Sequence, residues 1–163
     1  MKNVYLIGLM GSGKTTLGRI LAQRVHRKHV DTDDLIETYF SMAIPQVFAE
    51  KGEDAFRDGE TEVLCRLSKQ RNRIVSTGGG IVLREENITL MRNSGTVIWI
   101  KRDPKRILQS PRIRKRPLLA NDVNAIYPIW EQRQPLYKKA CHFVVYNDGD
   151  RENTVQELLK ILR

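Results

Sequence analysis

The 163-residue sequence predicts an α/β domain in which helices cover both faces of a parallel β-sheet. Two observations support this fold class. Short apolar runs typical of buried strands alternate with segments of helical periodicity along the chain. The glycine-rich segment Gly8–Thr15 also lies directly between an apolar run, Val4–Ile7, and a helical pattern, as in the first strand, loop and helix of such folds. Ligands are therefore expected at the carboxyl ends of the strands.

The segment Gly8–Thr15 fits the phosphate-binding pattern G-x-x-x-x-G-K-[ST], known as the P-loop, at every fixed position. Its glycines allow several backbone N–H groups to converge on one phosphate, and Lys14 adds a positive charge. Thr15 opens the next helix, whose dipole favours an anion, and its hydroxyl is an expected ligand of nucleotide-bound Mg²⁺. A glycine-rich turn without a ligand is the alternative, but such a turn needs neither the lysine nor three glycines.

Composition limits the class of protein. The length suits one domain, and 28 Lys and Arg against 19 Asp and Glu give a net charge of +9 and a pI near 9.8. This excess fits either nucleic-acid binding or an enzyme that handles a nucleotide and an acidic co-substrate. With no long apolar run or signal peptide, a cytosolic protein without membrane contact is expected. Cys65 and Cys141 lack metal-ligand spacing and are expected to be reduced thiols.

The other elements follow the same alternation. Asp103 and Pro104 resemble an N-cap and first helical residue, and Asn153 with Gln156 resembles a capping box. Proline residues are expected to interrupt one of the later helices, at 128 and 135. In chain order, we expect a helix after Thr15, a short helix that Pro45 opens and Gly52 ends, a longer helix from Glu53, strands over 74–77, 96–100 and 142–146, and helices over 85–92, 122–140 and 153–162.

A short strand predicted over 28–34 ends in three carboxylates. Asp31 and Asp33 leave it two residues apart, so both are expected to face the ligand crevice while Thr32 points away. Asp31 could hold a magnesium ion, directly or through water, and Asp33 could accept a hydrogen bond from an attacking hydroxyl. The alternative is that they cap the following helix; Asp33 or Asp34 is the expected cap, and capping is the preferred role of Asp34.

Arg57 lies at the start of a helical segment, where its charge opposes the helix dipole unless an anion faces it. A substrate carboxylate would fit, and Glu60 is three residues on, close enough to hold the guanidinium. An exposed arginine in a surface ion pair is the alternative. The glycine run 78–80 lets the backbone approach a ligand closely. A hairpin turn there is less favoured, because the flanks resemble a strand and a helix rather than two strands.

A cationic, proline-bounded segment over 110–117 breaks all periodicity. It contains Arg112, Arg114, Lys115 and Arg116, and it is too short for a basic recognition helix. A mobile lid that closes over phosphates explains these residues better, and one or two of them could stabilise charge on a phosphoryl group in transfer. A solvated loop or a nucleic-acid patch is the alternative. Spacing alone leaves open whether Arg133 reaches the same crevice.

Taken in order, these motifs resemble those of the shikimate kinase family, from Lys2 to about Tyr146. The resemblance implies the nucleoside-monophosphate-kinase fold, with a parallel sheet of five strands in the order 2-3-1-4-5. It also implies a single domain over 1–163, with a substrate-binding helical segment about 33–61 and a mobile lid about 110–122. The motifs that carry it are Gly8–Thr15, Asp31-Thr32-Asp33, Phe56-Arg57, Gly78-Gly79-Gly80, Arg116-Pro117-Leu118-Leu119 and Arg133-Gln134-Pro135-Leu136-Tyr137.

The resemblance further implies Mg²⁺-dependent transfer of the terminal phosphate of ATP to the 3-hydroxyl of shikimate, on the route to chorismate and the aromatic amino acids. Catalysis would fall to Lys14, Asp33 and Arg116, and Mg²⁺ would lie on Thr15 and Asp31. The implied nucleotide-binding residues are Gly11, Ser12, Gly13, Lys14, Thr15, Thr16, Arg112, Arg116 and Arg151. The implied shikimate-binding residues are Asp33, Arg57, Gly78, Gly79, Gly80 and Arg133, with Glu60 bracing Arg57 and an apolar wall of Ile44, Phe48, Phe56, Pro117 and Leu118.

Two alternatives stay open at this point. The same fold could phosphorylate another small acceptor, such as gluconate. A P-loop regulator that binds nucleic acid is motivated only by the net charge of +9, and it is disfavoured because the cations lie partly in the lid, are otherwise scattered, and have no interleaved aromatic residues. We therefore expect ATP and shikimate as ligands, no nucleic acid, and a monomer, since a small kinase that closes a lid can act alone.

Overall fold

A computed structural model describes the backbone of residues 1–163 and all side chains except those of Arg114 and Pro117. The chain forms one sheet of five parallel strands in the order β2-β3-β1-β4-β5, which confirms the predicted fold class and strand order. The strands are β1 (Asn3–Ile7), β2 (Lys28–Asp31), β3 (Arg73–Ser76), β4 (Gly95–Lys101) and β5 (Phe143–Tyr146).

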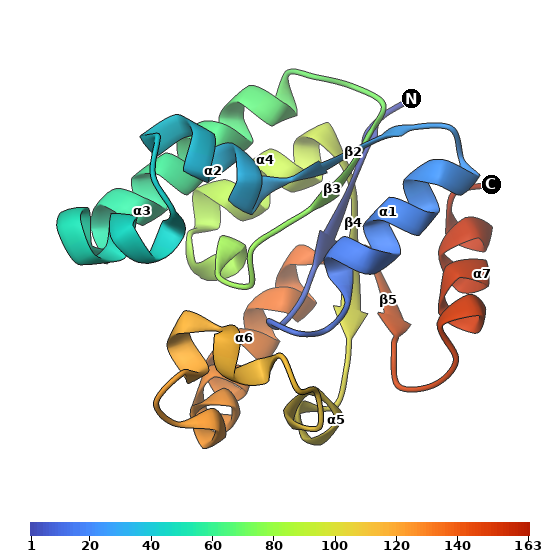
Figure 1. Cartoon of the computed structure of the whole chain (residues 1–163). Helices are drawn as coiled ribbons and strands as arrows, with labels where there is room; N and C mark the ends of the chain where they lie inside the picture. Colours follow the sequence, from blue (N-terminus) through green and yellow to red (C-terminus); the bar gives the residue numbers. More distant parts are fainter.

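Helices cover both faces of this sheet (Figure 1). Alternate side chains of β1 enter two different cores: Val4 and Leu6 pack with residues of α1 and α7, whereas Tyr5 and Ile7 pack with residues of α3, α4 and α6. The three-layer arrangement follows from this alternation. The helices are α1 (Lys14–Arg24), α2 (Thr32–Phe40), α3 (Ile44–Ser68), α4 (Glu85–Ser94), α5 (Pro104–Leu108), α6 (Ile126–Ala140) and α7 (Arg151–Ile161).

The parallel register brings the ends of three strands to one edge of the sheet. Leu6 and Asp31 are both level with Ser76, the last residue of β3, so β1, β2 and β3 end together. Thr77 continues from β3 and holds this alignment, because its backbone N–H and its hydroxyl both donate to the Leu6 carbonyl. The loop after β1, the start of α2 and the loop after β3 therefore lie side by side.

Two helix caps differ from the sequence prediction. Asp31, rather than Asp33 or Asp34, caps α2, and its carboxylate accepts a hydrogen bond from the Asp33 N–H at 3.0 Å. Thr32 does not point away from this edge as a strand residue would: it begins α2, and its hydroxyl accepts from the Gly78 N–H. Asp31 is the strand's last residue and keeps extended dihedral angles, as an N-cap requires.

The cap of α7 also lies earlier than expected. Asp150 accepts from the Asn153 N–H, so Asn153 is inside the helix and forms no capping box with Gln156. Gly52 ends one helical segment as predicted, with φ of 83°, but the chain resumes its helix at once, so α3 includes both expected helices.

Proline residues shape α6 less than predicted. Pro128 is the third residue of α6, where the missing N–H removes no intrahelical hydrogen bond, and the helix also continues through Pro135. The segment before it contains only short 3₁₀ turns, over 113–115, 117–119 and 123–125. Cys65 and Cys141 are free thiols, as expected. None of the helices in the described part of the chain combines the length and apolar character that a membrane-crossing segment needs.

Gly95 provides a test of the strand packing. A Cβ at this position would meet the Asn3 carbonyl oxygen and would lie 2.8 Å from the Tyr5 ring. Because backbone on the neighbouring strand cannot move aside, we expect Gly95→Ala to lower the free energy of unfolding by about 1–3 kcal/mol, measured by urea denaturation. Gly149→Ala is the control, since nothing lies within 4 Å of its added Cβ. Equal stability of the two variants would contradict this packing.

Candidate active site

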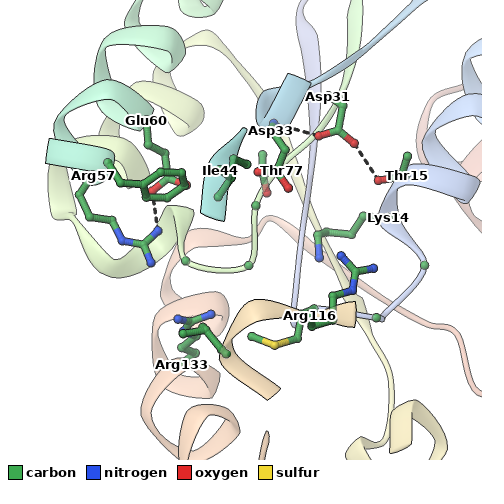
Figure 2. A pocket seen from close by; sticks show the side chains of 18 of the residues that line it. Lys14, Thr15, Asp31, Asp33, Ile44, Arg57, Glu60, Thr77, Arg116 and Arg133 are labelled. Carbon is green, nitrogen blue, oxygen red and sulfur yellow. Dashed lines mark hydrogen bonds and ion pairs between the residues drawn. The ribbon is translucent and has the colours of Figure 1, made fainter. Parts of the chain in front are cut away.

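A cavity of about 430 Å³ opens where β1, β2 and β3 end (Figure 2). Its walls are formed by the loop after β1, the start of α2, parts of α3, the glycine run after β3, the segment 110–122 and α6. The cavity is lined by Met10, Gly11, Gly13, Lys14, Thr15, Thr16, Asp31, Asp33, Ile44, Phe48, Phe56, Arg57, Glu60, Thr77, Gly78, Gly79, Gly80, Arg116, Leu118 and Arg133.

The loop between β1 and α1 depends on glycine. Gly11 and Gly13 have φ angles of 76° and 98°, and Gly13 directly precedes α1 in the left-handed region. A Cβ on Gly13 would collide with the side-chain amide of Asn147, which donates to the Ser12 carbonyl. Ser12 is itself fully buried and does not line the cavity. The loop thus presents the N-terminus of α1 to the cavity, as anion binding requires.

Lys14 is buried against its own loop. Its ammonium donates to the carbonyl oxygens of Gly8 at 2.7 Å and Leu9 at 2.9 Å. Burial, together with the positive charge of Arg116, lowers the pKa of Lys14 to about 7, although Asp33 and Asp31 oppose this shift. Lys14 therefore occupies a site where added negative charge would stabilise its protonated form.

Two carboxylates face Lys14 from the start of α2. Asp31 accepts a hydrogen bond from the Thr15 hydroxyl at 2.8 Å, which places a carboxylate and a hydroxyl side by side next to the P-loop (Figure 2). Burial raises the pKa of Asp33 to about 6, and the negative charge of Asp31 adds to this shift while Lys14 and Arg116 oppose it. Asp33 can therefore exchange a proton near neutral pH.

A buried ion pair forms another wall of the cavity. Arg57 is 8% exposed and donates to Glu60 at 2.9 Å, and its other terminal nitrogen lies 3.5 Å from the exposed Glu53. Glu60 is 1% exposed, and burial raises its pKa against the opposing charge of Arg57. The guanidinium also presses against Gly80, where any side chain would collide with it. The predicted bracing of Arg57 by Glu60 is thus present in the structure.

Arg133 approaches the same cavity from α6. It is 4% exposed, and its Nε atom has no hydrogen-bond partner among the described residues. Its guanidinium lies against Gly79, at the same end of the cavity as Arg57 and away from Lys14 (Figure 2). A Cβ on Gly79 would lie 3.2 Å from the Met10 backbone nitrogen and 3.3 Å from Arg133. Any side chain at position 79 would therefore crowd both the P-loop backbone and the arginine.

An apolar wall closes the space between the two arginines. Phe48 and Phe56 pack with their ring centroids 4.5 Å apart, and Ile44 and Leu118 also line the cavity. The side chains of Pro117 and Arg114, which the sequence placed in the wall and the lid, lie outside the described residues. Buried cations beside apolar surface suit a small ring-shaped ligand with an anionic group.

The structure brings most of the predicted site residues to one cavity. Arg112 and Arg151 are exposed and do not line it, and Ser12 contributes no lining surface. Two lining residues had no predicted role: Met10 occupies a variable position of the loop pattern, and Thr77 separates β3 from the glycine run. Their only sequence signal was that each lies within or beside a motif.

Comparisons with known proteins agree on one family. The family model for shikimate kinase matches residues 10–163. A shikimate kinase of Clostridium botulinum (strain Alaska E43 / Type E3) is 39% identical over 99% of this chain and 98% of its own length. A shikimate kinase of Neisseria gonorrhoeae is 42% identical over 99% of both chains. The similarity thus spans nearly the whole chain in each case.

Solved structures give the same result. The shikimate kinase from Acinetobacter baumannii in complex with shikimate superposes with a TM-score of 0.92 at 33% identity, over 99% of this chain and 93% of that one. The shikimate kinase from Bacteroides thetaiotaomicron has a TM-score of 0.90 at 30% identity. With its P-loop, its paired aspartates and its buried arginines around one cavity, this chain belongs to the shikimate kinase family.

Proposed function

We propose that the protein transfers the terminal phosphate of ATP to the 3-hydroxyl of shikimate, giving shikimate 3-phosphate for chorismate and aromatic amino acid biosynthesis. The observation that carries the proposal is the cavity itself, in which Asp33 lies between the P-loop lysine and a buried pair of arginines. One end of the cavity suits a polyphosphate and the other suits a carboxylate. The family relationship supports the same reaction.

The charge balance of the acceptor end supports a monoanionic ligand. Arg57 pairs with the buried Glu60 and, at 3.5 Å, with the exposed Glu53, whereas the buried Arg133 forms no ion pair among the described residues, so its positive charge is left to be balanced. Shikimate carries one carboxylate. Because an unbalanced charge is costly to bury, the ligand carboxylate would both bind to and stabilise this pair of arginines. Gly78, Gly79 and Gly80 would let the ring approach the backbone.

The nucleotide end follows from the P-loop. Backbone N–H groups of Gly11, Gly13 and Thr16 would hold the phosphates at the start of α1, and Lys14 would exchange its two carbonyl acceptors for phosphate oxygens. The Ser12 N–H donates to the Leu9 carbonyl at 3.1 Å, so Ser12 would bind a phosphate only by giving up this bond. Arg112 and Arg151 would act on the nucleotide from the exposed rim. These roles are proposals that rest on the family motifs and on the loop geometry.

The residues at the loop mouth fit a magnesium ion. The Thr15 hydroxyl and the Asp31 carboxylate lie 2.8 Å apart, and both are hard oxygen ligands of the kind that Mg²⁺ prefers. When bound, the ion neutralises charge on the phosphates and orients them. Thr15 and Asp31 would hold it, Thr15 through its hydroxyl and Asp31 directly or through water.

The chemistry then needs two further side chains. Asp33 would orient the acceptor hydroxyl and take its proton as the oxygen attacks the terminal phosphorus, while the bond from that phosphorus to the bridging oxygen of ADP breaks. Arg116 lines the cavity and lies close enough to lower the pKa of Lys14, so it would stabilise negative charge on the phosphoryl group in transfer. The lid about 110–122 would close over both ligands, and the segment about 33–61 would bind the acceptor. Action as a monomer and a cytosolic location stay predictions of the sequence.

An assay of ADP release with Mg²⁺, ATP and shikimate tests the proposal. We expect turnover that depends on shikimate, because the charge and depth of the acceptor end suit a cyclic monocarboxylate. Controls without acceptor and with gluconate distinguish the substrate from a general ATPase and from the alternative acceptor. Turnover that is independent of shikimate, or faster with gluconate, would contradict the proposed function.

Asp33→Asn tests the role of the carboxylate. We expect kcat to fall by about 10²–10⁴-fold, because an amide cannot accept the proton, while nucleotide binding measured by calorimetry changes little. Asp34→Asn is the matched control, since Asp34 is the next residue but is exposed and outside the cavity. Near wild-type turnover of Asp33→Asn would remove this role.

The pH dependence of the rate tests both titrating groups. Ionised Asp33 is the active form, so kcat/KM for shikimate should fall as pH decreases through about 6. Protonated Lys14 is the form that binds phosphate, so kcat/KM for ATP should fall as pH rises through about 7. At saturating ATP the phosphates stabilise the ammonium, and this alkaline limb should move to higher pH. A flat profile from pH 5 to 9 would contradict both assignments.

A further inference from the structure

Tyr137 joins α6 to the glycine run without lining the cavity. It is fully buried, its ring packs on Trp99 with centroids 5.7 Å apart, and its hydroxyl donates to the Gly79 carbonyl at 2.5 Å. It lies four residues after Arg133, so both side chains project from the same face of α6. The helix α6, which supplies Arg133, therefore also holds the Gly79 backbone through Tyr137.

The hydrogen bond from Tyr137 to the Gly79 carbonyl determines the direction in which the next backbone N–H, that of Gly80, points. The Gly79 carbonyl and the Gly80 N–H belong to one planar trans peptide, so they point in opposite directions. With the carbonyl turned toward Tyr137, the Gly80 N–H points away from Tyr137, and Gly80 lines the cavity against Arg57. This N–H has no hydrogen-bond partner among the residues that the structure describes.

Because its residues are glycines, the Gly79–Gly80 peptide needs a contact from another part of the chain to fix its orientation. Three successive glycines, 78–80, have few steric limits on their dihedral angles, so the peptide plane between Gly79 and Gly80 can rotate at little cost. The flanking hydrogen bonds do not restrain that plane directly, since Gly78 donates to Thr32 and the Gly78 carbonyl accepts from Ile81. Tyr137 supplies the hydrogen bond that does.

We propose that Tyr137 is a positioning residue: its hydroxyl orients the Gly79–Gly80 peptide so that the Gly80 N–H donates to the acceptor substrate beside Arg57 and Arg133. The class of ligand is a small carboxylate with ring hydroxyls, and in this respect the inference rests on the proposed function. Burial raises the pKa of Tyr137 to about 12, although the charge of Arg133 and a hydrogen bond from it oppose this shift, so the hydroxyl stays protonated and can donate throughout the working pH range.

The test compares two buried tyrosines. Tyr137→Phe keeps the ring and removes the hydroxyl, and we expect KM for shikimate to rise about five- to tenfold while KM for ATP changes less than twofold. Tyr5→Phe is the matched control, because Tyr5 is also fully buried and its hydroxyl bonds to Ser94, which does not line the cavity. It should change neither KM.

A purely structural role of Tyr137 predicts a different result. In that case both KM values would move together, or neither would move, and either outcome would overturn the proposal. Wild-type protein without shikimate-dependent turnover would instead contradict the proposed function. If the wild-type protein turns over shikimate and Tyr137→Phe has the same KM for shikimate as the wild type, this inference alone is contradicted.

Amide hydrogen exchange provides a second test, which uses only the wild-type protein and so does not depend on whether a variant folds. In wild-type protein, the Gly80 amide hydrogen should exchange rapidly without ligand, and saturating shikimate should slow its exchange at least tenfold, as measured by NMR. Val25 provides an internal reference: its backbone N–H donates to the Leu21 carbonyl just after the C-terminal end of α1, neither residue lines the cavity, and its exchange should not respond to shikimate. Unchanged exchange at Gly80 under saturation would overturn the proposal.

Discussion

The alignment of β1, β2 and β3 at one edge of the sheet is the constraint on which the cavity depends. These strands end level with one another, and Thr77 secures the alignment through two hydrogen bonds to the Leu6 carbonyl. A shift of one residue would exchange the side chains that face each layer and would separate Asp31 from Thr15. The buried strands therefore determine where the polar groups meet, although they contribute few of those groups themselves.

Charge inside the cavity is distributed between two ends rather than spread evenly. Lys14 and Arg116 share one end with Asp31 and Asp33, whereas the arginines of α3 and α6 share the other with Glu60. Different elements supply the two ends, and α2 connects them through Asp33. The shifted pKa values of Lys14 and Asp33 follow from this crowding and from burial, since neither group is fully solvated or fully paired.

The sequence predicted the parts of this site that depend on local chemistry. The P-loop pattern, the strands around it and the pairing of Arg57 with Glu60 were all readable from spacing, and the strand order came from the family resemblance. Contacts across the fold were not readable: Tyr137 and Gly79 are 58 residues apart, and no pattern links them. The cap of α2 was misplaced because Asp31, Asp33 and Asp34 are equally suited by residue type, and only the end of β2 decides among them. Arg112 and Arg151 show the same limit, since spacing does not give the reach of an exposed side chain.

Gly79 lies where the P-loop backbone and the arginine of α6 approach each other. A single Cβ at this position would lie 3.2 Å from the Met10 backbone nitrogen and 3.3 Å from the Arg133 guanidinium, closer than ordinary van der Waals contact. A bulkier residue would therefore displace groups at both ends of the cavity at once. We expect such a variant to alter the cooperativity between two ligands as well as their separate affinities, because any coupling between two sites acts equally in both directions.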